Sequence, residues 1–261
     1  MILLVDIGNT RVKWALLRGV RLGRMRAKAH GGDPRILEAI LRRAPRAVTR
    51  VMAVNVAGVR FERALRAASR DRFDVRPELV RSTREAGGVR NGYRETWRLG
   101  ADRWVGVIGA RALARARSAV VANAGTALTI DAVSAGGRHL GGAIIPGAAA
   151  MTSAIIKGTN GIGRRARDAA ASRRRRARDA AASRRRLFAA DTASALAAGA
   201  EFAIAALIDR AVDEATRELR APPLLILTGG AAPELKRRLR HKARMVPDLV
   251  LHGLAVLARG F

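Results

Sequence analysis

The chain has 261 residues, enough for one large or two modest domains, each with a sizeable core. It contains no Cys, which excludes disulfides and a cysteine zinc site. It also has no long apolar run and no signal-peptide pattern, which favours a cytoplasmic protein without membrane spans. The net charge of +29 predicts attraction to polyanions, but only 3% of residues are aromatic, so we favour a solvated basic surface over a nucleic-acid partner.

A β-hairpin is predicted over residues 1–17. Four apolar residues lead to Asp6, a tight turn follows at Gly8-Asn9-Thr10, and a second apolar run begins at Val12. Glycine lets backbone N–H groups approach phosphate oxygens, Asn9 and Thr10 offer donors, and Asp6 can hold Mg²⁺. The same pattern makes ordinary hairpin turns, so this stretch by itself leaves both interpretations open.

The next elements alternate between strands and helices, as is typical of an α/β fold. Strands are predicted over 20–29, 50–56 and 75–80, and helices over 33–43, 59–70 and 104–115. Residues 87–102 are glycine-rich and polar, which indicates a surface loop beside a cleft. Asp102 then lies at a helix N-terminus, either as its N-cap or as a general base that accepts a hydroxyl proton while Arg103 attracts an acidic substrate.

A second strand–turn–strand unit is predicted over residues 119–133. It contains Asn123, Gly125 and Thr126, and Asn123 follows Asp6 by 117 positions, as Gly125 follows Gly8. Two such units at equal offsets predict a duplicated protein with one phosphate hairpin in each of two lobes, 1–116 and 117–261. The remaining predicted elements are a strand at 140–146, helices at 148–156 and 193–219, a strand at 224–227, a Gly-Gly turn at 229–230, and helices at 234–240 and 249–257.

Residues 163–187 interrupt this pattern with an Arg-rich tandem repeat. The segment 166–176 reads ARDAAASRRRR and the segment 177–187 reads ARDAAASRRRL. A local duplication explains the repeat, and its composition favours a mobile surface segment over a polyanion-binding arm.

With these pieces in place, the sequence closely resembles the type III pantothenate kinases. The matching motifs are DIGNT at 6–10, Tyr93, GADRW at 100–104, AGTALTID at 124–131, GGAIIPG at 141–147, DT at 191–192 and TGG at 228–230. The resemblance covers nearly the whole chain except the Arg-rich repeat. It implies two actin-like (ribonuclease H-like) lobes with ATP and Mg²⁺ in the cleft between them, and phosphorylation of pantothenate, the first step of coenzyme A synthesis. No Walker-type P-loop motif is present.

The resemblance also implies roles for particular residues. The ATP-binding set is Asp6, Gly8, Asn9, Thr10, Arg11, Lys13, Gly125 and Thr126, with Asp6 holding Mg²⁺. The pantothenate-binding set is Tyr93, Gly100, Ala101, Asp102, Arg103 and Thr192, with Asp102 as the catalytic proton acceptor. Family members are homodimers whose substrate site lies near the subunit boundary.

One position departs from the family pattern. Many members have Asp where this chain has Asn123, and that carboxylate helps to bind an activating monovalent cation, K⁺ or NH₄⁺. Asn offers a carbonyl oxygen but no charge, so we expect weakened or absent potassium dependence. Two alternative functions stay open at this point: a non-catalytic relative that acts as a regulatory or nucleic-acid-binding factor, and an actin-like kinase for another small hydroxy-acid or sugar.

Overall fold

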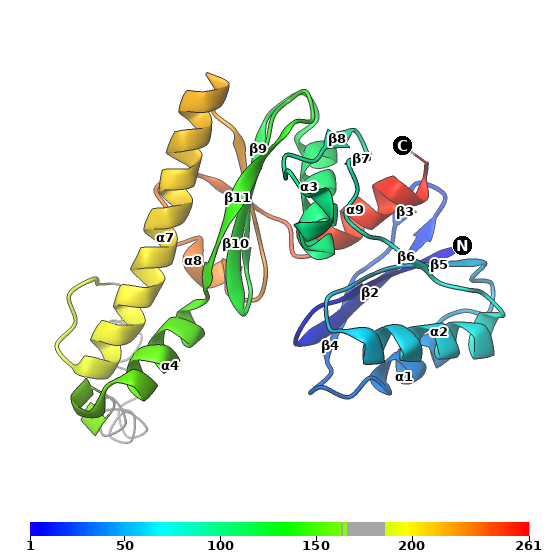
Figure 1. Ribbon diagram of the computed structural model, residues 1–261, viewed down its shortest axis with the longest axis horizontal. Helices are drawn as coiled ribbons and strands as arrows, with labels where there is room; N and C mark the ends of the chain where they lie inside the picture. The colour runs from blue at the N-terminus through cyan, green and yellow to red at the C-terminus, as the bar shows by residue number, and fades with distance from the viewer. Residues whose placement is uncertain (163, 166–185, 261) are drawn as a thin grey trace.

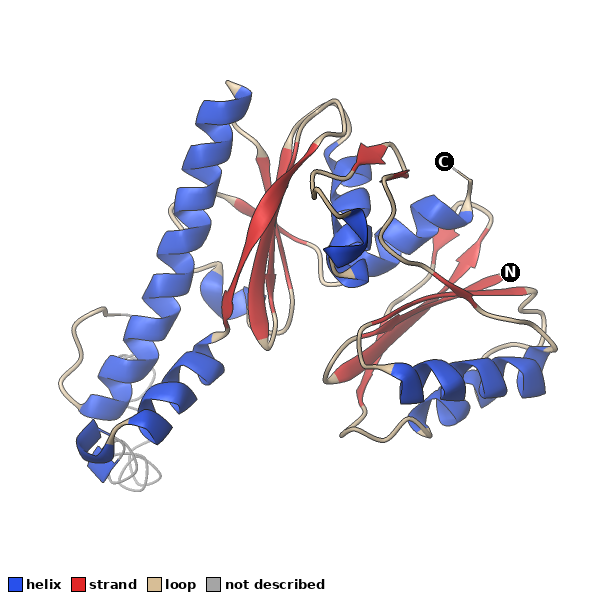
Figure 2. Cartoon of the chain, in the orientation of Figure 1, coloured by secondary structure: helices blue, strands red, loops and turns tan. Residues whose placement is uncertain are grey.

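The computed structural model describes residues 1–162, 164–165 and 186–260, and it contains two main β-sheets with helices outside and between them (Figure 1; Figure 2). The predicted α/β class is therefore confirmed. The Arg-rich repeat predicted to be mobile lies almost entirely outside the described residues.

The first sheet has the strand order β3-β2-β1-β5-β6, and β4 also pairs with β2. Antiparallel pairing of β1 with β2 confirms the first hairpin, and β1 is parallel to β5. The single strand predicted over 20–29 is wrong: Gly23 donates its N–H to the Leu16 carbonyl, which turns the chain between two short strands. The strands are β1 (Ile2–Ile7), β2 (Arg11–Arg18), β3 (Arg21–Leu22), β4 (Arg26–Ala29), β5 (Arg50–Asn55) and β6 (Glu78–Leu79).

Two helices, α1 (Ile36–Arg42) and α2 (Val59–Phe73), cover the outer face of the first sheet (Figure 1). Their apolar faces follow helical spacing, with Leu37 and Leu41 on α1 and Phe61 and Leu65 on α2 buried against the sheet. Both helices confirm the predicted elements. The loop predicted over 87–102 contains the short strand β8 (Val89–Arg90), paired with β7 (Glu85–Ala86), and the 3₁₀ turn η1 (Thr96–Arg98).

The second sheet has the order β11-β10-β9-β12-β13. Its β9–β10 pair confirms the second hairpin, and β9 is parallel to β12. The strands are β9 (Ala119–Ala124), β10 (Ala127–Val133), β11 (His139–Pro146), β12 (Leu224–Thr228) and β13 (Ala243–Met245). Outside this sheet lie α4 (Ala148–Gly158), α7 (Thr192–Leu219) and α8 (Ala232–Leu235) (Figure 1).

The helix predicted over 234–240 is wrong, because α8 ends at Leu235. Beyond it, the backbone N–H groups of Arg240 and His241 donate to the buried carboxylate of Asp209 on α7. These bonds direct the chain into β13 instead of continuing the helix.

Helices α3 (Ala101–Ala114) and α9 (Leu249–Ala258) lie between the two sheets (Figure 1). Trp104 and Leu254 share one core with Leu4 of the first sheet and Val121 of the second. The two helices cross so closely that a Cβ at Gly253 would lie 1.9 Å from the Val105 carbonyl oxygen, so only glycine fits there. Although α9 belongs to the second lobe in sequence, it also contacts β1, β2 and β5 of the first sheet. None of the helices in the described part of the chain could span a lipid bilayer.

Candidate active site

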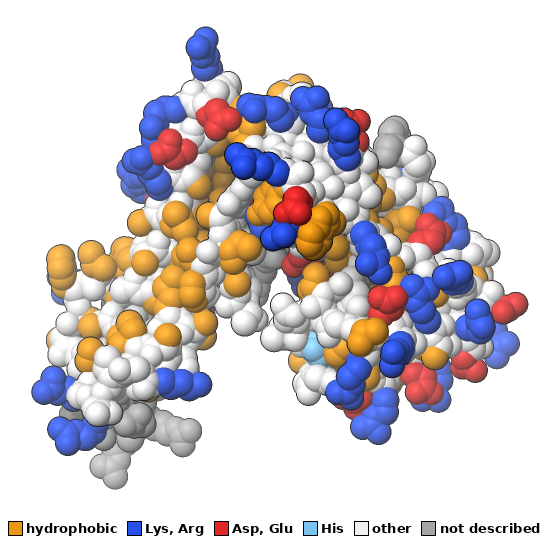
Figure 3. Space-filling model, viewed as in Figure 1, with side chains coloured by type: hydrophobic (Ala, Val, Ile, Leu, Met, Phe, Trp, Pro, Cys, Tyr) orange, Lys and Arg blue, Asp and Glu red, His pale blue; other side chains and the backbone are white. Residues whose placement is uncertain are grey.

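The surface is deeply hollowed between the two lobes (Figure 3). The β1–β2 turn and the β9–β10 turn lie on the two sides of this hollow, at the same end (Figure 1). In each turn a glycine N–H donates back across the hairpin, from Gly8 to the Arg11 carbonyl (3.0 Å) and from Gly125 to the Ala127 carbonyl (3.1 Å). The two stretches predicted to bind ATP therefore form similar turns.

Asp6 is a buried carboxylate at the end of β1, only 6% exposed. Burial raises its pKa to about 6, the Lys13 charge opposes the shift, and the Asp102 charge adds to it. Its side chain receives no hydrogen bond from the described residues. A desolvated carboxylate of this kind is suited to binding a cation. A positive ion would compensate the negative charge of Asp6, which burial and the Asp102 charge both disfavour. Asp6 is therefore compatible with the predicted Mg²⁺ contact, which stays a prediction.

We expect Asp6→Asn to make the ligand-free protein more stable at pH 8, by about 3 kcal/mol if the pKa rises from 3.8 to about 6. The folded state binds the Asp6 proton more tightly than the unfolded state does. Stability from this group is therefore lost as the pH rises from about 4 to about 6, and the neutral amide avoids the loss. Urea unfolding of both proteins across pH 3–8 measures the difference, which should vanish at the acid end. A gap that does not change with pH would contradict this account.

Asp102 lies in the first turn of α3, where the N-cap is Gly100. The N-cap interpretation of Asp102 is therefore wrong, because the helix begins at Ala101. The Asp102 carboxylate accepts the Arg103 N–H at 2.9 Å. Burial raises the Asp102 pKa, while backbone hydrogen bonds and the Arg103 charge oppose the shift. The Asp102 charge also contributes to the raised pKa of Asp6.

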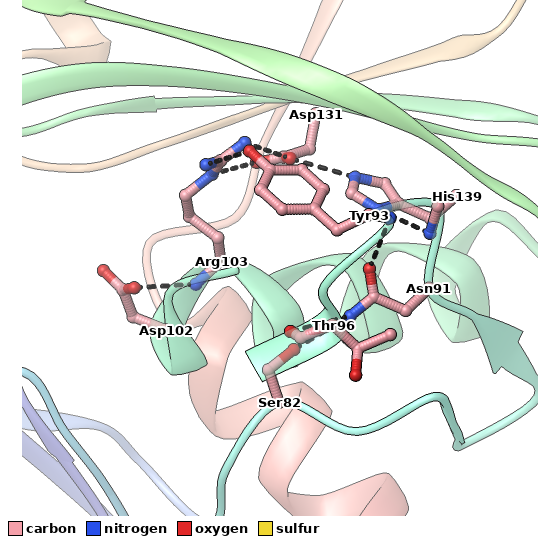
Figure 4. Close-up of polar contacts among 9 residues, drawn as sticks. Ser82, Asn91, Tyr93, Thr96, Asp102, Arg103, Asp131 and His139 are labelled. Atoms are coloured by element: carbon pink, nitrogen blue, oxygen red, sulfur yellow. Dashed lines mark hydrogen bonds and ion pairs between the residues drawn. The ribbon is translucent and has the colours of Figure 1, made fainter. Parts of the chain in front are cut away.

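Arg103 points away from Asp102 into a buried polar cluster (Figure 4). Its Nε donates to Asp131 Oδ2 at 2.9 Å, its Nη2 to Asp131 Oδ1 at 2.7 Å, and its Nη1 to the Tyr93 hydroxyl at 2.9 Å. This bidentate pairing compensates the guanidinium charge. Because Asp131 already balances its charge, Arg103 attracts a substrate carboxylate less strongly than the sequence analysis predicted.

The cluster continues through His139 on β11, which the sequence interpretation missed together with Asp131 on β10. His139 lies 3.0 Å from Asp131 through Nε2, stacks on Tyr93, and accepts the Gly92 N–H through Nδ1. Asn91 accepts the Tyr93 N–H and so fixes the loop before α3. Asp131 is the last residue of the AGTALTID motif, and an acid in an otherwise buried strand was a signal that a buried partner must exist.

Around the second hairpin, Asn123 lies beside Thr129 on β10 and Thr228 on β12. Gly229 follows with φ at +94°, and a Cβ there would lie 2.4 Å from the Ala124 carbonyl oxygen. The Gly229-Gly230 turn is thus pressed against the end of β9, next to the predicted phosphate contacts Gly125 and Thr126. The junction of β11 and α4 joins them, since the Gly147 N–H donates to the Thr126 carbonyl at 3.0 Å.

Thr192 is separate from the other predicted pantothenate contacts. It begins α7, and Asp191 is the N-cap, accepting the Ser194 N–H at 2.8 Å. Thr192 lines a cavity of about 750 Å³ together with residues of α4 and α7, such as Met151 and Leu196. This end of α7 lies at the outer end of the second lobe, away from α3 (Figure 1).

Comparison with known proteins identifies the family. Residues 2–214 match the family model of type III pantothenate kinases. Type III pantothenate kinases of Nitrosococcus oceani and Aromatoleum aromaticum are 35% and 39% identical to this chain, with 99% of this chain covered in both and 94% and 98% of the relatives.

Solved structures show the same fold at low identity. A protein from Sinorhizobium meliloti, provisionally assigned as a 2-dehydro-3-deoxygalactonokinase, matches with a TM-score of 0.55 and 19% identity over 99% of this chain and 98% of its own. The ethanolamine utilization protein EutJ from Carboxydothermus hydrogenoformans matches with a TM-score of 0.50 and 13% identity, over 97% and 88%. The architecture is the predicted actin-like one, and by its sequence the chain belongs to the type III pantothenate kinase family.

Proposed function

We propose that this protein transfers the γ-phosphoryl group of ATP to the primary hydroxyl of pantothenate, giving 4'-phosphopantothenate. The observation that supports this most directly is the arrangement of the two glycine turns on the two sides of the hollow between the lobes (Figure 1; Figure 3). Phosphoryl transfer depends mainly on positioning and on compensation of charge, so two glycine turns and one base are sufficient protein machinery.

Each group has a definite task in this reaction. Gly8 and Gly125 shape the two turns, since their own N–H groups bond within the hairpins. The N–H groups of Asn9, Thr10 and Thr126, with the side chains of Arg11 and Lys13, hold the triphosphate, and Asp6 would hold Mg²⁺. The ion, when bound, neutralises charge on the phosphate oxygens. Pantothenate lies against Tyr93, Gly100, Ala101 and Arg103, where the N-terminus of α3 favours its carboxylate. Asp102 accepts the hydroxyl proton as the oxygen attacks phosphorus.

A coupled assay that follows ADP release with ATP, Mg²⁺ and pantothenate tests the proposal. We expect turnover only when all three are present, with a product that carries one phosphate on the alcohol oxygen. If wild-type protein releases no ADP with pantothenate but does so with another hydroxy-acid or a sugar, the substrate assignment fails and the kinase class stands.

We expect rates in potassium, ammonium and sodium buffers to be similar, because Asn123 brings no negative charge to the monovalent-cation position. The matched variant Asn123→Asp restores a carboxylate beside Thr129 and Thr228 and should introduce activation by potassium. Initial rates at equal ionic strength measure both proteins. Strong selective activation of the wild type by potassium would contradict the prediction.

We further propose that the protein works as a homodimer in which Thr192 of one protomer completes the pantothenate site of the other. The second lobe exposes large apolar side chains near α4 and the start of α7, and such patches are typical of interfaces. They include Ile155 at 42%, Leu187 at 48% and Phe188 at 90% exposed. Thr192 lies at this apolar end and not beside Tyr93, so a partner subunit is the natural way for it to reach a substrate there.

Mixed dimers test this arrangement. We expect Asp102→Asn to be inactive and Thr192→Val to raise the KM for pantothenate about tenfold, through loss of one hydrogen bond. Co-expression should restore activity at low pantothenate, because one site of each mixed dimer then has both wild-type residues. A solution mass of one 27.9 kDa chain at assay concentration would contradict the dimer.

A further inference from the structure

His30 is a buried histidine next to the first hairpin turn, at the end of β4, and it belongs to none of the family motifs. Both of its ring nitrogens are engaged by backbone atoms. The Gly32 N–H donates to Nδ1 at 3.0 Å, and Nε2 lies 3.0 Å from the Gly8 carbonyl oxygen. A backbone N–H can only donate, so Nδ1 must be the acceptor, the proton must be on Nε2, and Nε2–H donates to the Gly8 oxygen.

The imidazole ring has little freedom to leave this position. It is 7% exposed and packs edge-to-face on Phe61 of α2, with ring centroids 4.5 Å apart. The His30 backbone N–H also donates to the Thr10 carbonyl at 3.2 Å. His30 therefore joins the tip of the hairpin, on both sides of Asn9, to the body of the first lobe.

The bond to Gly8 determines where a neighbouring donor points. The Gly8 carbonyl and the Asn9 N–H belong to one peptide group, and in a planar trans peptide these two groups point in opposite directions. No peptide bond in the described part of the chain is cis. Holding the Gly8 oxygen toward His30 therefore turns the Asn9 N–H away from His30, and Asn9 itself is an exposed residue. Within the described residues, neither the Asn9 nor the Thr10 N–H has a protein acceptor.

Glycine makes this peptide easy to reverse without the histidine. Gly8 carries no Cβ, so both orientations of the Gly8–Asn9 peptide are sterically open to it. A reversed peptide would present a carbonyl oxygen where the N–H now points. An oxygen repels an anionic phosphate, whereas an N–H binds it.

We propose that His30 is a positioning residue that holds the Gly8–Asn9 peptide with its N–H available to a phosphate of the bound nucleotide. The inference rests on the proposed function in one respect, that the first hairpin binds ATP. His30 touches neither substrate and acts only through Gly8.

Two amide variants separate this role from simple packing. The side-chain nitrogen of Gln reaches about as far as histidine Nε2, so His30→Gln can still donate to the Gly8 oxygen. Asn reaches only as far as Nδ1, so His30→Asn can accept the Gly32 N–H but cannot reach Gly8. Titration calorimetry without pantothenate gives the Kd for ATP of each variant and of the wild type. The KM for each substrate and the midpoint of thermal unfolding are compared in the same way.

For His30→Asn we expect ATP binding about tenfold weaker, the size of one lost charge-assisted hydrogen bond, with an unchanged KM for pantothenate and an unchanged kcat at saturating ATP. His30→Gln should restore the Kd for ATP. An unchanged Kd for ATP in His30→Asn would overturn the proposal. It would also be overturned if both variants bound ATP equally weakly and the loss of affinity paralleled the loss of thermal stability. If the wild type binds ATP but does not phosphorylate pantothenate, the proposed function fails. The comparison of Kd values for ATP then still tests the positioning role of His30. A wild type that binds no ATP would overturn both.

Discussion

We expect Asp102→Asn to lower kcat for pantothenate phosphorylation about 10²- to 10⁴-fold, the usual contribution of a positioned general base. The amide keeps the size of the carboxylate but cannot accept the hydroxyl proton. The N–H of Arg103, which now donates to the Asp102 oxygen, can donate to the amide oxygen instead, so the start of α3 should be preserved. The coupled assay measures kcat, and calorimetry with ATP alone should give a wild-type Kd.

The pH dependence of the wild type provides a second test of the same base. Burial raises the Asp102 pKa, and Arg103 only partly opposes the shift. The base must be ionised to act, so kcat should fall with decreasing pH at a higher pH than an exposed Asp would give. The part of the acid limb that comes from Asp102 should disappear in Asp102→Asn. Wild-type kcat in this variant would contradict the assignment of Asp102 as the proton acceptor.

The second large effect is expected at Asp131. We expect Asp131→Asn to lower the free energy of unfolding by about 3–5 kcal/mol, because it leaves the charge of Arg103 buried without a counter-charge. The side chains of both residues are almost fully buried, at 3% and 6% exposure. The substitution also disturbs the contact of Asp131 with His139. Urea unfolding followed by circular dichroism measures the loss.

A double variant distinguishes the buried charge from lost packing. Arg103→Met combined with Asp131→Leu removes both charges and keeps apolar volume, so it should recover most of the stability that Asp131→Asn loses. Although its stability recovers, the double variant should have a higher KM for pantothenate than the wild type, because Tyr93 loses the guanidinium that donates to its hydroxyl. An unfolding midpoint for Asp131→Asn equal to that of the wild type would mean that the pair does not stabilise the fold.

Local patterns were sufficient to predict most elements. The two hairpins, α1, α2, α3, α4, α7 and α9 were predictable because apolar periodicity and glycine turns act over a few residues. The two errors have different causes. The strand over 20–29 is divided by a nearby hydrogen bond from Gly23 to Leu16, whereas α8 is cut short by Asp209, which is far away in sequence.

The sequence by itself determined which residues are chemically suited to this site. It determined that two glycine turns recur at a fixed offset, that Asp6 and Asp102 are acids at element ends, and that the chain resembles one kinase family. These properties depend on residue type and on near neighbours.

Only the tertiary structure decided what surrounds those residues. It paired Arg103 with Asp131 and His139, joined His30 to the Gly8 turn, and separated Thr192 from Tyr93. The physical reason is that desolvation, ion pairing and peptide orientation depend on atoms brought together from distant parts of the chain. No local pattern records which atoms those will be.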